Sequence, residues 1–81
     1  MIMDRTKVFE TVKEYILNQL SIDPSRVTLD ADLVKDLGAD SANLMMLVMD
    51  LEGEYDTTVE DSDIAHIKTV GDIVECIMKR A

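Results

Sequence analysis

Hydrophobic residues recur at spacings of three and four along three stretches of the chain, which is the pattern of amphipathic helices. The first stretch runs from Asp4 to Leu20 and the second from Ser41 to Glu54. The third follows Thr69, where Val70, Ile73, Val74 and Ile77 share one face. We therefore predict three main helices, with a further short helical turn at residues 61–65.

The segments between these helices contain clear boundary signals. Pro24 is expected to end the first helix, since proline disfavours helix at the residue before it. Residues 21–40 then form a long connection, and five hydrophobic side chains are available to attach it to the core, namely Ile22, Val27, Leu29, Leu33 and Leu37. Thr69 and Asp72 resemble a capping box that opens the last helix. The predicted fold is an all-α bundle of three main helices plus one short helix, with a long loop between the first two.

Length and composition support one small domain spanning residues 1–81. The chain has 81 residues, of which 47% are hydrophobic, and no tryptophan, so its core must be mostly aliphatic. Three glycines and one proline are too few for a sandwich or barrel. The N-terminus lacks the apolar stretch of a signal peptide, and the single cysteine, Cys76, permits no internal disulfide. These features predict a cytoplasmic protein.

The net charge of −9 is concentrated in the middle of the chain. Residues 30–63 carry eleven acidic side chains against Lys35 alone, a net charge of −10. This field should repel nucleic acids and anionic membranes and attract basic protein partners. The longest apolar run, Leu44 to Met49, is too short to span a bilayer, so membrane insertion is not expected. The charge also favours a monomer.

The second predicted helix carries more apolar surface than one stripe requires. Its stripe consists of Leu44, Leu47, Val48, Leu51 and Tyr55. Met45, Met46 and Met49 lie off that stripe, and methionine suits a surface that adapts to several partners. A helix buried on two sides would also explain them, because a broad apolar arc is normal for a central bundle helix.

Ser41 lies between an acidic segment and this helix, and two interpretations are open. Serine is a preferred N-cap residue, so it could simply start the helix. Asp40 is an equally good cap, which would leave the Ser41 hydroxyl free. A phosphate attached there would benefit from the unpaired N–H groups and positive potential of a helix N-terminus. A hydrolytic nucleophile is not expected, since no histidine closely precedes the serine and no G-x-S-x-G motif is present.

The stretch Asp36-Leu37-Gly38-Ala39-Asp40-Ser41 resembles the prosthetic-group attachment motif of acyl carrier proteins. The resemblance covers nearly the whole chain and continues without gaps through four further segments, Leu47-Val48-Met49, Leu51-Glu52, Glu54-Tyr55-Asp56 and Lys68-Thr69-Val70-Gly71-Asp72-Ile73. It implies an acyl-carrier-like bundle whose Ser41 is esterified with 4′-phosphopantetheine from coenzyme A. The thiol of that arm, not Cys76, would hold the acyl chain as a thioester.

The resemblance also implies roles for other residues. Asp40 and Gly38 would flank the attachment site. The docking residues would be Asp36, Asp40, Ala42, Met45, Met46, Met49 and Glu52, and the acyl cavity would be lined by Leu47, Leu51, Val59, Ile64, Ile67 and Ile73. The implied partners are a phosphopantetheinyl transferase and acyl-transferring and ketosynthase-type enzymes with basic or apolar docking patches. The carrier would perform no catalysis itself, and its pathway would be fatty acid or related lipid or polyketide biosynthesis.

This chain departs from the family pattern mainly on the predicted docking helix. Ala42 stands where a leucine or methionine is usual, and Asn43 and Met46 stand where an acid is common. We therefore expect a specialised carrier with a more hydrophobic docking face. Ile64, where a smaller residue is common, is expected to shorten the cavity. The alternatives are a carrier for aminoacyl or peptidyl groups, and a non-enzymatic helical adaptor in which Ser41 is only a cap.

The remaining candidates for chemistry favour structural roles. Cys76 is expected to be a buried, unreactive thiol in the last helix, because nothing near it in sequence would lower its pKa. His66 has no companion histidine and is expected to be exposed. An EF-hand would need an oxygen ligand and a glycine where Val34 and Lys35 stand, so no specific metal site is predicted.

Overall fold

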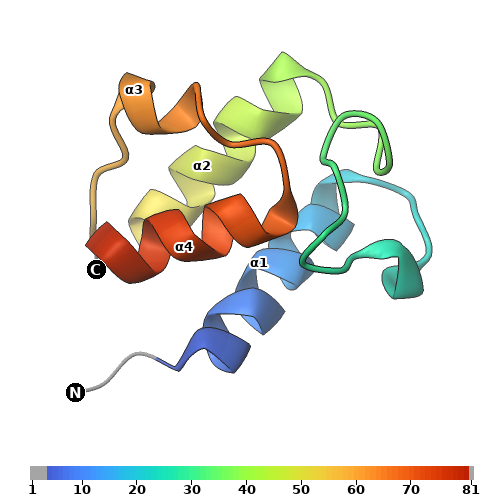
Figure 1. Cartoon of the computed structure of the whole chain (residues 1–81), viewed down its shortest axis with the longest axis horizontal. Helices are drawn as coiled ribbons and strands as arrows, with labels where there is room; N and C mark the ends of the chain where they lie inside the picture. Colours follow the sequence, from blue (N-terminus) through green and yellow to red (C-terminus); the bar gives the residue numbers. More distant parts are fainter. Residues whose placement is uncertain (1–3, 81) are drawn as a thin grey trace.

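The computed structural model describes residues 4–80, and the predicted domain of residues 1–81 extends beyond them at both ends. It contains α1 (Arg5–Gln19), the short 3-10 helix η1 (Pro24–Arg26), α2 (Ser41–Tyr55), α3 (Asp61–Ile64) and α4 (Val70–Arg80). The three main helices and the short one confirm the predicted all-α architecture. Figure 1 shows the connection between α1 and α2 at one end of the molecule and α3 at the other.

Helices α1 and α4 begin where the sequence places capping residues. Asp4 caps α1, and its side chain accepts a 2.9 Å hydrogen bond from the backbone N–H of Thr6. The predicted capping box of α4 is confirmed: the N–H of Asp72 donates to Thr69 Oγ1 at 3.1 Å, and the N–H of Thr69 donates to Asp72 Oδ2 at 3.0 Å. The hydrogen bonds that Asp72 accepts from the backbone of Lys68 and Thr69 lower its pKa.

The core is aliphatic, as its composition predicts, and α1 packs against both α2 and α4. Its largest fully buried side chains are Ile16, Leu33, Leu51, Ile73 and Ile77. All four residues of the predicted apolar face of α4 are buried. No described helix is long and apolar enough to cross a membrane.

The long connection is attached to the core by four of the five side chains expected to do so. Val27, Leu33 and Leu37 are buried and Ile22 is half-buried. The expectation for Leu29 is wrong, because its side chain is 42% exposed. Leu29 instead contributes its backbone carbonyl oxygen, which accepts a 2.9 Å hydrogen bond from the N–H of Gly71.

Backbone pairing joins this connection to the segment before α4. Asp32 and Thr69 form an isolated antiparallel bridge, and the N–H of Leu33 donates to the carbonyl oxygen of Lys68 at 2.9 Å. Gly71 lets the two segments approach this closely, since a Cβ there would lie 3.0 Å from the carbonyl oxygen of Leu29 and would push the segments slightly apart. The loop before α2 is thus held beside the start of α4.

Short α3 is held to the other end of α4 by ion pairs. Arg80 pairs with Asp63 and lies 3.7 Å from a Glu60 carboxylate oxygen. None of the residues of α3 is fully buried, so these ion pairs and the half-buried Ile64 connect α3 to the bundle.

Candidate functional site

Ser41 is the first residue of α2, and its side chain is exposed. The cap of this helix is Asp40, whose Oδ1 accepts a 2.9 Å hydrogen bond from the N–H of Asn43. Asn43 Oδ1 accepts in turn from the N–H of Asp40 at 3.1 Å, which completes a capping box. Because Asp40 and Asn43 together cap the helix, the Ser41 hydroxyl is not needed for that purpose. This confirms the interpretation in which Asp40 leaves Ser41 free.

The loop that leads to Ser41 is fixed by its own hydrogen bonds. Asp32 Oδ1 accepts from the N–H groups of Val34 and Lys35 at 2.9 and 2.8 Å, and Asp36 Oδ2 accepts from the N–H of Asp32 at 2.7 Å. The hydrogen bond from the Lys35 backbone is the main cause that lowers the pKa of Asp32. These contacts order the backbone that leads to Ser41.

Gly38 gives the loop its final turn before α2. Its φ of +77° lies in the left-handed region, which glycine adopts without steric cost. A Cβ at this position would meet no atom within 4 Å, so the space around it is open. The approach to Ser41 is therefore not obstructed on this side, and the first N–H groups of α2 give the site a positive potential.

The exposed face of α2 is rich in methionine. Met45, Met46 and Met49 are 46%, 56% and 64% exposed, while Leu47, Val48 and Leu51 are buried. The apolar stripe therefore faces the core as predicted, and the methionines project away from it. Among the described residues nothing covers this second side, which argues against a helix buried on two sides.

The residues predicted to bind partners do not all have equally free side chains. Asp36, Asp40 and Ala42 are exposed, although Asp36 and Asp40 also accept the backbone hydrogen bonds described above. Glu52 is half-buried, and its Oε2 accepts a 2.7 Å hydrogen bond from the N–H of Val59. This carboxylate therefore orders the segment after α2, and it is less available to a partner than the methionines.

The six residues predicted to line an acyl cavity fall into two groups. Leu47, Leu51, Val59 and Ile73 are buried in the core, while Ile64 and Ile67 are half-buried at its edge. Ile67 borders two surface pockets. The smaller pocket, of about 220 Å³, lies beside Leu44 of α2 and is lined by Asp32, Leu33, Val34, Lys35, Leu44, Ile67 and Lys68.

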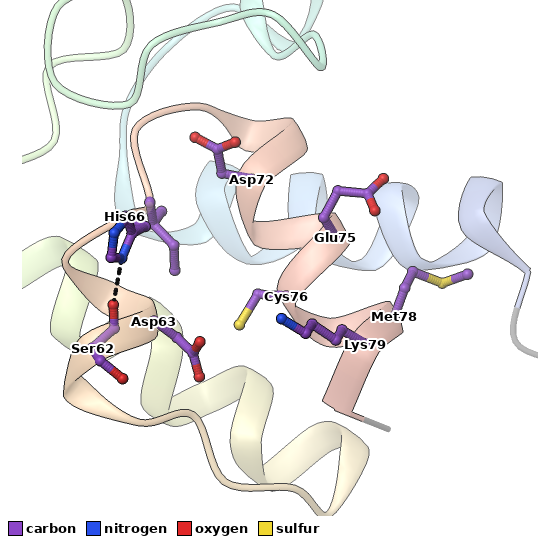
Figure 2. Close-up of a pocket in the computed structure, with 9 residues that line it drawn as sticks. Ser62, Asp63, His66, Asp72, Glu75, Cys76, Met78 and Lys79 are labelled. Atoms are coloured by element: carbon purple, nitrogen blue, oxygen red, sulfur yellow. Dashed lines mark hydrogen bonds between the residues drawn. The ribbon is translucent and has the colours of Figure 1, made fainter.

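The larger pocket, of about 660 Å³, lies between α3 and α4 (Figure 2) and is lined by Ser62, Asp63, His66, Ile67, Asp72, Glu75, Cys76, Met78 and Lys79. The Cys76 side chain is half-buried rather than buried, which corrects the sequence expectation. Burial nevertheless raises the pKa of the Cys76 thiol, and Asp63 adds to that rise, so the thiol is not activated.

His66 also has a structural role at this pocket. It is exposed, as predicted, and its Nδ1 donates a 2.7 Å hydrogen bond to the carbonyl oxygen of Ser62, which Figure 2 marks with a dashed line. Within residues 4–80 no three of the histidine, cysteine, aspartate and glutamate side chains come together as metal ligands.

Two sets of residues at the site were not predicted from the sequence. Asn43 completes the α2 capping box. The residue usual at this position of a capping box is Glu or Gln, so asparagine is a weak sequence signal for it. Lys35 and Lys68 line the smaller pocket together. They are the only lysine or arginine residues between positions 30 and 78, and that isolation is a signal that could have identified them.

Comparison with known proteins gives a consistent result. The family model for a phosphopantetheine attachment site matches residues 10–77. The chain is 49% identical to the acyl carrier protein of Thermotoga maritima over 76 residues, which is 94% of each protein. It is 42% identical to the acyl carrier protein of Petrotoga mobilis, over 96% of this chain and 92% of the relative.

Solved structures agree with these sequence matches. The acyl carrier protein of Enterococcus faecalis superimposes with a TM-score of 0.81 at 35% identity, covering 98% of this chain and 100% of that one. A putative acyl carrier protein from Mycobacterium tuberculosis gives 0.80 at 36% identity, covering 86% of this chain and 93% of that one.

Proposed function

Because this chain belongs to the family of acyl carrier proteins with a phosphopantetheine attachment site, we propose that Ser41 is the residue that bears the arm. Members of this family are carriers rather than enzymes, and their cofactor is 4′-phosphopantetheine. We further propose that the acyl groups belong to fatty acid biosynthesis. These functions need one accessible hydroxyl in a fixed position, which Ser41 supplies.

The observation that carries this assignment is the division of roles between Asp40 and Ser41. Asp40 satisfies the N–H of Asn43, so the exposed Ser41 hydroxyl can be esterified without loss of the helix cap. A phosphodiester on Ser41 would lie at the N-terminus of α2, where the unpaired N–H groups favour negative charge. The open space at Gly38 leaves room for it. The residues present therefore fit the group.

Attachment requires Ser41 Oγ to lose its proton and form a bond to the phosphorus next to the pantetheine of coenzyme A. The pyrophosphate bond of coenzyme A breaks in the same step, and the adenosine bisphosphate fragment leaves with the electron pair. We propose that the phosphopantetheinyl transferase supplies the base that removes this proton. When bound, the arm supplies a terminal thiol that holds acyl groups as thioesters.

The smaller pocket is the best-placed entrance for an acyl chain. Leu44 lines it and stands three residues after Ser41, so the two side chains are neighbours on the surface of α2. Leu33 and Ile67 continue the apolar lining toward the core. The buried residues Leu47, Leu51, Val59 and Ile73, together with Ile64, would then move apart or pack around a longer chain.

The docking surface that we propose is centred on Met45, Met46 and Met49, with Ala42, Asp36 and Asp40 at its Ser41 end. The transferase and the acyl-handling biosynthetic enzymes of the family must reach Ser41, and this surface adjoins it. We propose that ketosynthase-type partners meet it through apolar contacts flanked by acidic residues. We also propose that the protein is cytoplasmic and that it is a monomer, as its charge favours. Analytical ultracentrifugation would test the monomeric state.

The first experiment is the intact mass of the protein before and after incubation with coenzyme A and a broad-specificity phosphopantetheinyl transferase. A gain of one phosphopantetheine that is lost in Ser41→Ala and kept in Ser62→Ala supports the assignment. Ser62 is an exposed serine of α3 and controls for nonspecific modification. A gain that survives in Ser41→Ala, or no gain with several transferases, would remove Ser41 as the attachment residue.

A further inference from the structure

Lys35 and Lys68 form a pair of positive charges in an otherwise acidic part of the molecule. Between residues 30 and 78 no other lysine or arginine occurs, and both of these line the smaller pocket. They come from segments far apart in the sequence, the connection before α2 and the connection between α3 and α4. Their meeting at one pocket is a property of the fold.

Backbone hydrogen bonds hold the two lysines in place. The N–H of Leu33 donates to the carbonyl oxygen of Lys68 at 2.9 Å, which joins the two segments directly. The N–H of Lys35 donates to Asp32 Oδ1 at 2.8 Å, and the N–H of Lys68 donates to Asp72 Oδ2 at 2.9 Å. The backbone at both lysines is therefore fixed before any ligand arrives, so binding a ligand there orders only side chains.

The positive charges of this pair are not neutralised by ion pairs. Within residues 4–80 the ion pairs involve Arg5 and Arg80, and neither lysine has a carboxylate oxygen within 4.0 Å. Asp32 is the one carboxylate that lines the pocket, and its Oδ1 accepts two backbone hydrogen bonds. The charges of Lys35 and Lys68 both help to lower the pKa of Asp32, and Lys68 also helps to lower that of Asp72, outside the lining. The pocket mouth thus has two positive charges and one negative charge, whereas residues 30–63 together carry −10.

The walls of the pocket are apolar and its volume is small. Leu33, Val34, Leu44 and Ile67 line it, and the volume of about 220 Å³ equals that of about seven water molecules at roughly 30 Å³ each. Such a pocket has room for a few methylene groups and one polar end. A site with apolar walls and two cations at its edge suits a short chain that ends in an anion.

We propose that Lys35 and Lys68 make this pocket selective for short acyl groups that end in a carboxylate. The inference rests on the proposed function, since the acyl group must be attached through the arm on Ser41. Leu44 places the pocket next to Ser41 on α2, within reach of a flexible arm. The methylene groups of the cargo contact Leu44 and Ile67, and its carboxylate lies between the two ammonium groups. These lysines are specificity-determining residues and take no part in a chemical step.

The pKa of the cargo carboxyl group reports where that group lies. A carboxylate in solvent near this protein experiences the field of a net charge of −9, which raises its pKa. A carboxylate within a few ångströms of a lysine has its pKa lowered, by about one unit or more. The two locations therefore shift the pKa in opposite directions.

The experiment uses the full chain loaded by a phosphopantetheinyl transferase with an amide-linked succinyl analogue of acyl-coenzyme A, which resists hydrolysis. The terminal carboxyl carries carbon-13, and its pKa is measured by NMR in the wild-type protein, in Lys35→Gln/Lys68→Gln and in Lys7→Gln. Lys7 is exposed on α1, away from the pocket lining, and controls for the loss of a positive charge. A 4-oxopentanoyl analogue supplies an uncharged cargo of equal length.

We expect the succinyl carboxyl pKa to lie about one unit below that of the free analogue in the wild type and in Lys7→Gln. It should rise to or above the free value in Lys35→Gln/Lys68→Gln. The amide resonances of Val34 and Ile67 should shift with the succinyl cargo more than with the 4-oxopentanoyl cargo. Intact mass establishes loading first, so failure to load counts against the proposed function and not against this inference.

Two results would overturn the inference after successful loading. One is a carboxyl pKa at or above that of the free analogue in the wild-type protein. The other concerns the change that the lysine substitutions cause in the amide resonances of Val34 and Ile67. If this change is the same in protein with the unacylated arm as in protein with the succinyl cargo, the lysines contact the phosphate of the arm rather than the cargo.

Discussion

The phenolic hydroxyl of Tyr15 donates a 2.6 Å hydrogen bond to Glu54 Oε1 and thereby joins α1 to the last turn of α2. The two residues are 39 positions apart in the sequence. This bond ties the C-terminal end of α2 to α1, while the capping box fixes its N-terminal end. The exposed methionine face lies between these two fixed points.

The Tyr15–Glu54 hydrogen bond raises the pKa of Tyr15 to about 12, with further contributions from burial and from the negative charges of Glu54, Asp50 and Glu14. We expect tyrosinate absorbance to show one tyrosine that titrates near 12. In Glu54→Gln this pKa should fall toward the ordinary value of 10.0, whereas Glu10→Gln, an exposed acid on α1, should leave it unchanged. A high-pH titration that is the same in Glu54→Gln would contradict this assignment.

The same shift has a defined effect on stability. Because the folded protein holds the Tyr15 proton more tightly than the unfolded chain, this contribution is fully present below pH 10 and is lost as the pH rises toward about 12. The urea midpoint of Tyr15→Phe should therefore vary less with pH over this range than that of the wild type.

The α2 cap predicts different outcomes for two neighbouring residues. Asp40→Ala removes the acceptor of the Asn43 N–H and should lower the free energy of unfolding by about 1 kcal/mol. Ser41→Ala should change it by less than about 0.5 kcal/mol, because Ser41 does not cap the helix. Urea denaturation of both variants measures these changes in the free energy of unfolding. Equal losses would mean that Ser41 shares the capping role.

Two helical glycines should respond oppositely to alanine. Gly53 is exposed in α2 and a Cβ there meets no atom within 4 Å, so Gly53→Ala should stabilise the protein by about 0.5–1 kcal/mol. Gly71→Ala places its Cβ against the backbone carbonyl oxygen of Leu29 at 3.0 Å and should destabilise by about 1 kcal/mol. Thermal or urea unfolding of the pair tests the contact, and a stabilising Gly71→Ala would contradict it.

The methionine face predicts docking that depends weakly on salt. Binding to a basic ketosynthase-type partner should change by less than about threefold between about 0.01 and 1 M salt, over which the Debye length falls from roughly 30 to 3 Å. Met45→Gln/Met49→Gln should weaken binding about tenfold, while Leu29→Gln, which removes an exposed apolar side chain outside α2, should not. Steep salt dependence would show that the acidic residues dominate docking instead.

Much of this molecule follows from local patterns in the sequence. The apolar stripes of α2 and α4 identify their buried faces because a helix repeats every 3.6 residues, and the exposed methionines follow from their position off the stripe. The capping function of Asp40 and the Thr69–Asp72 box are also local, since each involves residues three apart. The exposure of Ser41 follows from the presence of a second capping residue, Asp40, and its role as the attachment residue stays a prediction from the motif.

What the sequence did not predict depends on contacts between distant segments. Leu29 is hydrophobic, as a core residue would be. Its backbone carbonyl oxygen accepts the hydrogen bond from Gly71, however, and its side chain is exposed. Glu52 has the charge of a docking residue, yet it accepts the N–H of Val59 after the chain turns at Asp56, whose φ of 50° is left-handed. The meeting of Lys35 and Lys68 likewise requires the pairing of Leu33 with Lys68.

That pairing gives the connection between α1 and α2 a property unusual for a loop. The amide of Leu33 donates to Lys68, the amide of Ala39 to Leu33 at 2.8 Å, and the amide of Val70 to Ala31 at 3.1 Å. Leu33, Ala39 and Val70 are all buried. Their amide hydrogens should exchange with solvent deuterium as slowly as those of the helices, because they open only when the bundle itself unfolds. Residues 31–39, which lead to Ser41, thus belong to the same cooperative unit as the core, although they lie outside every helix.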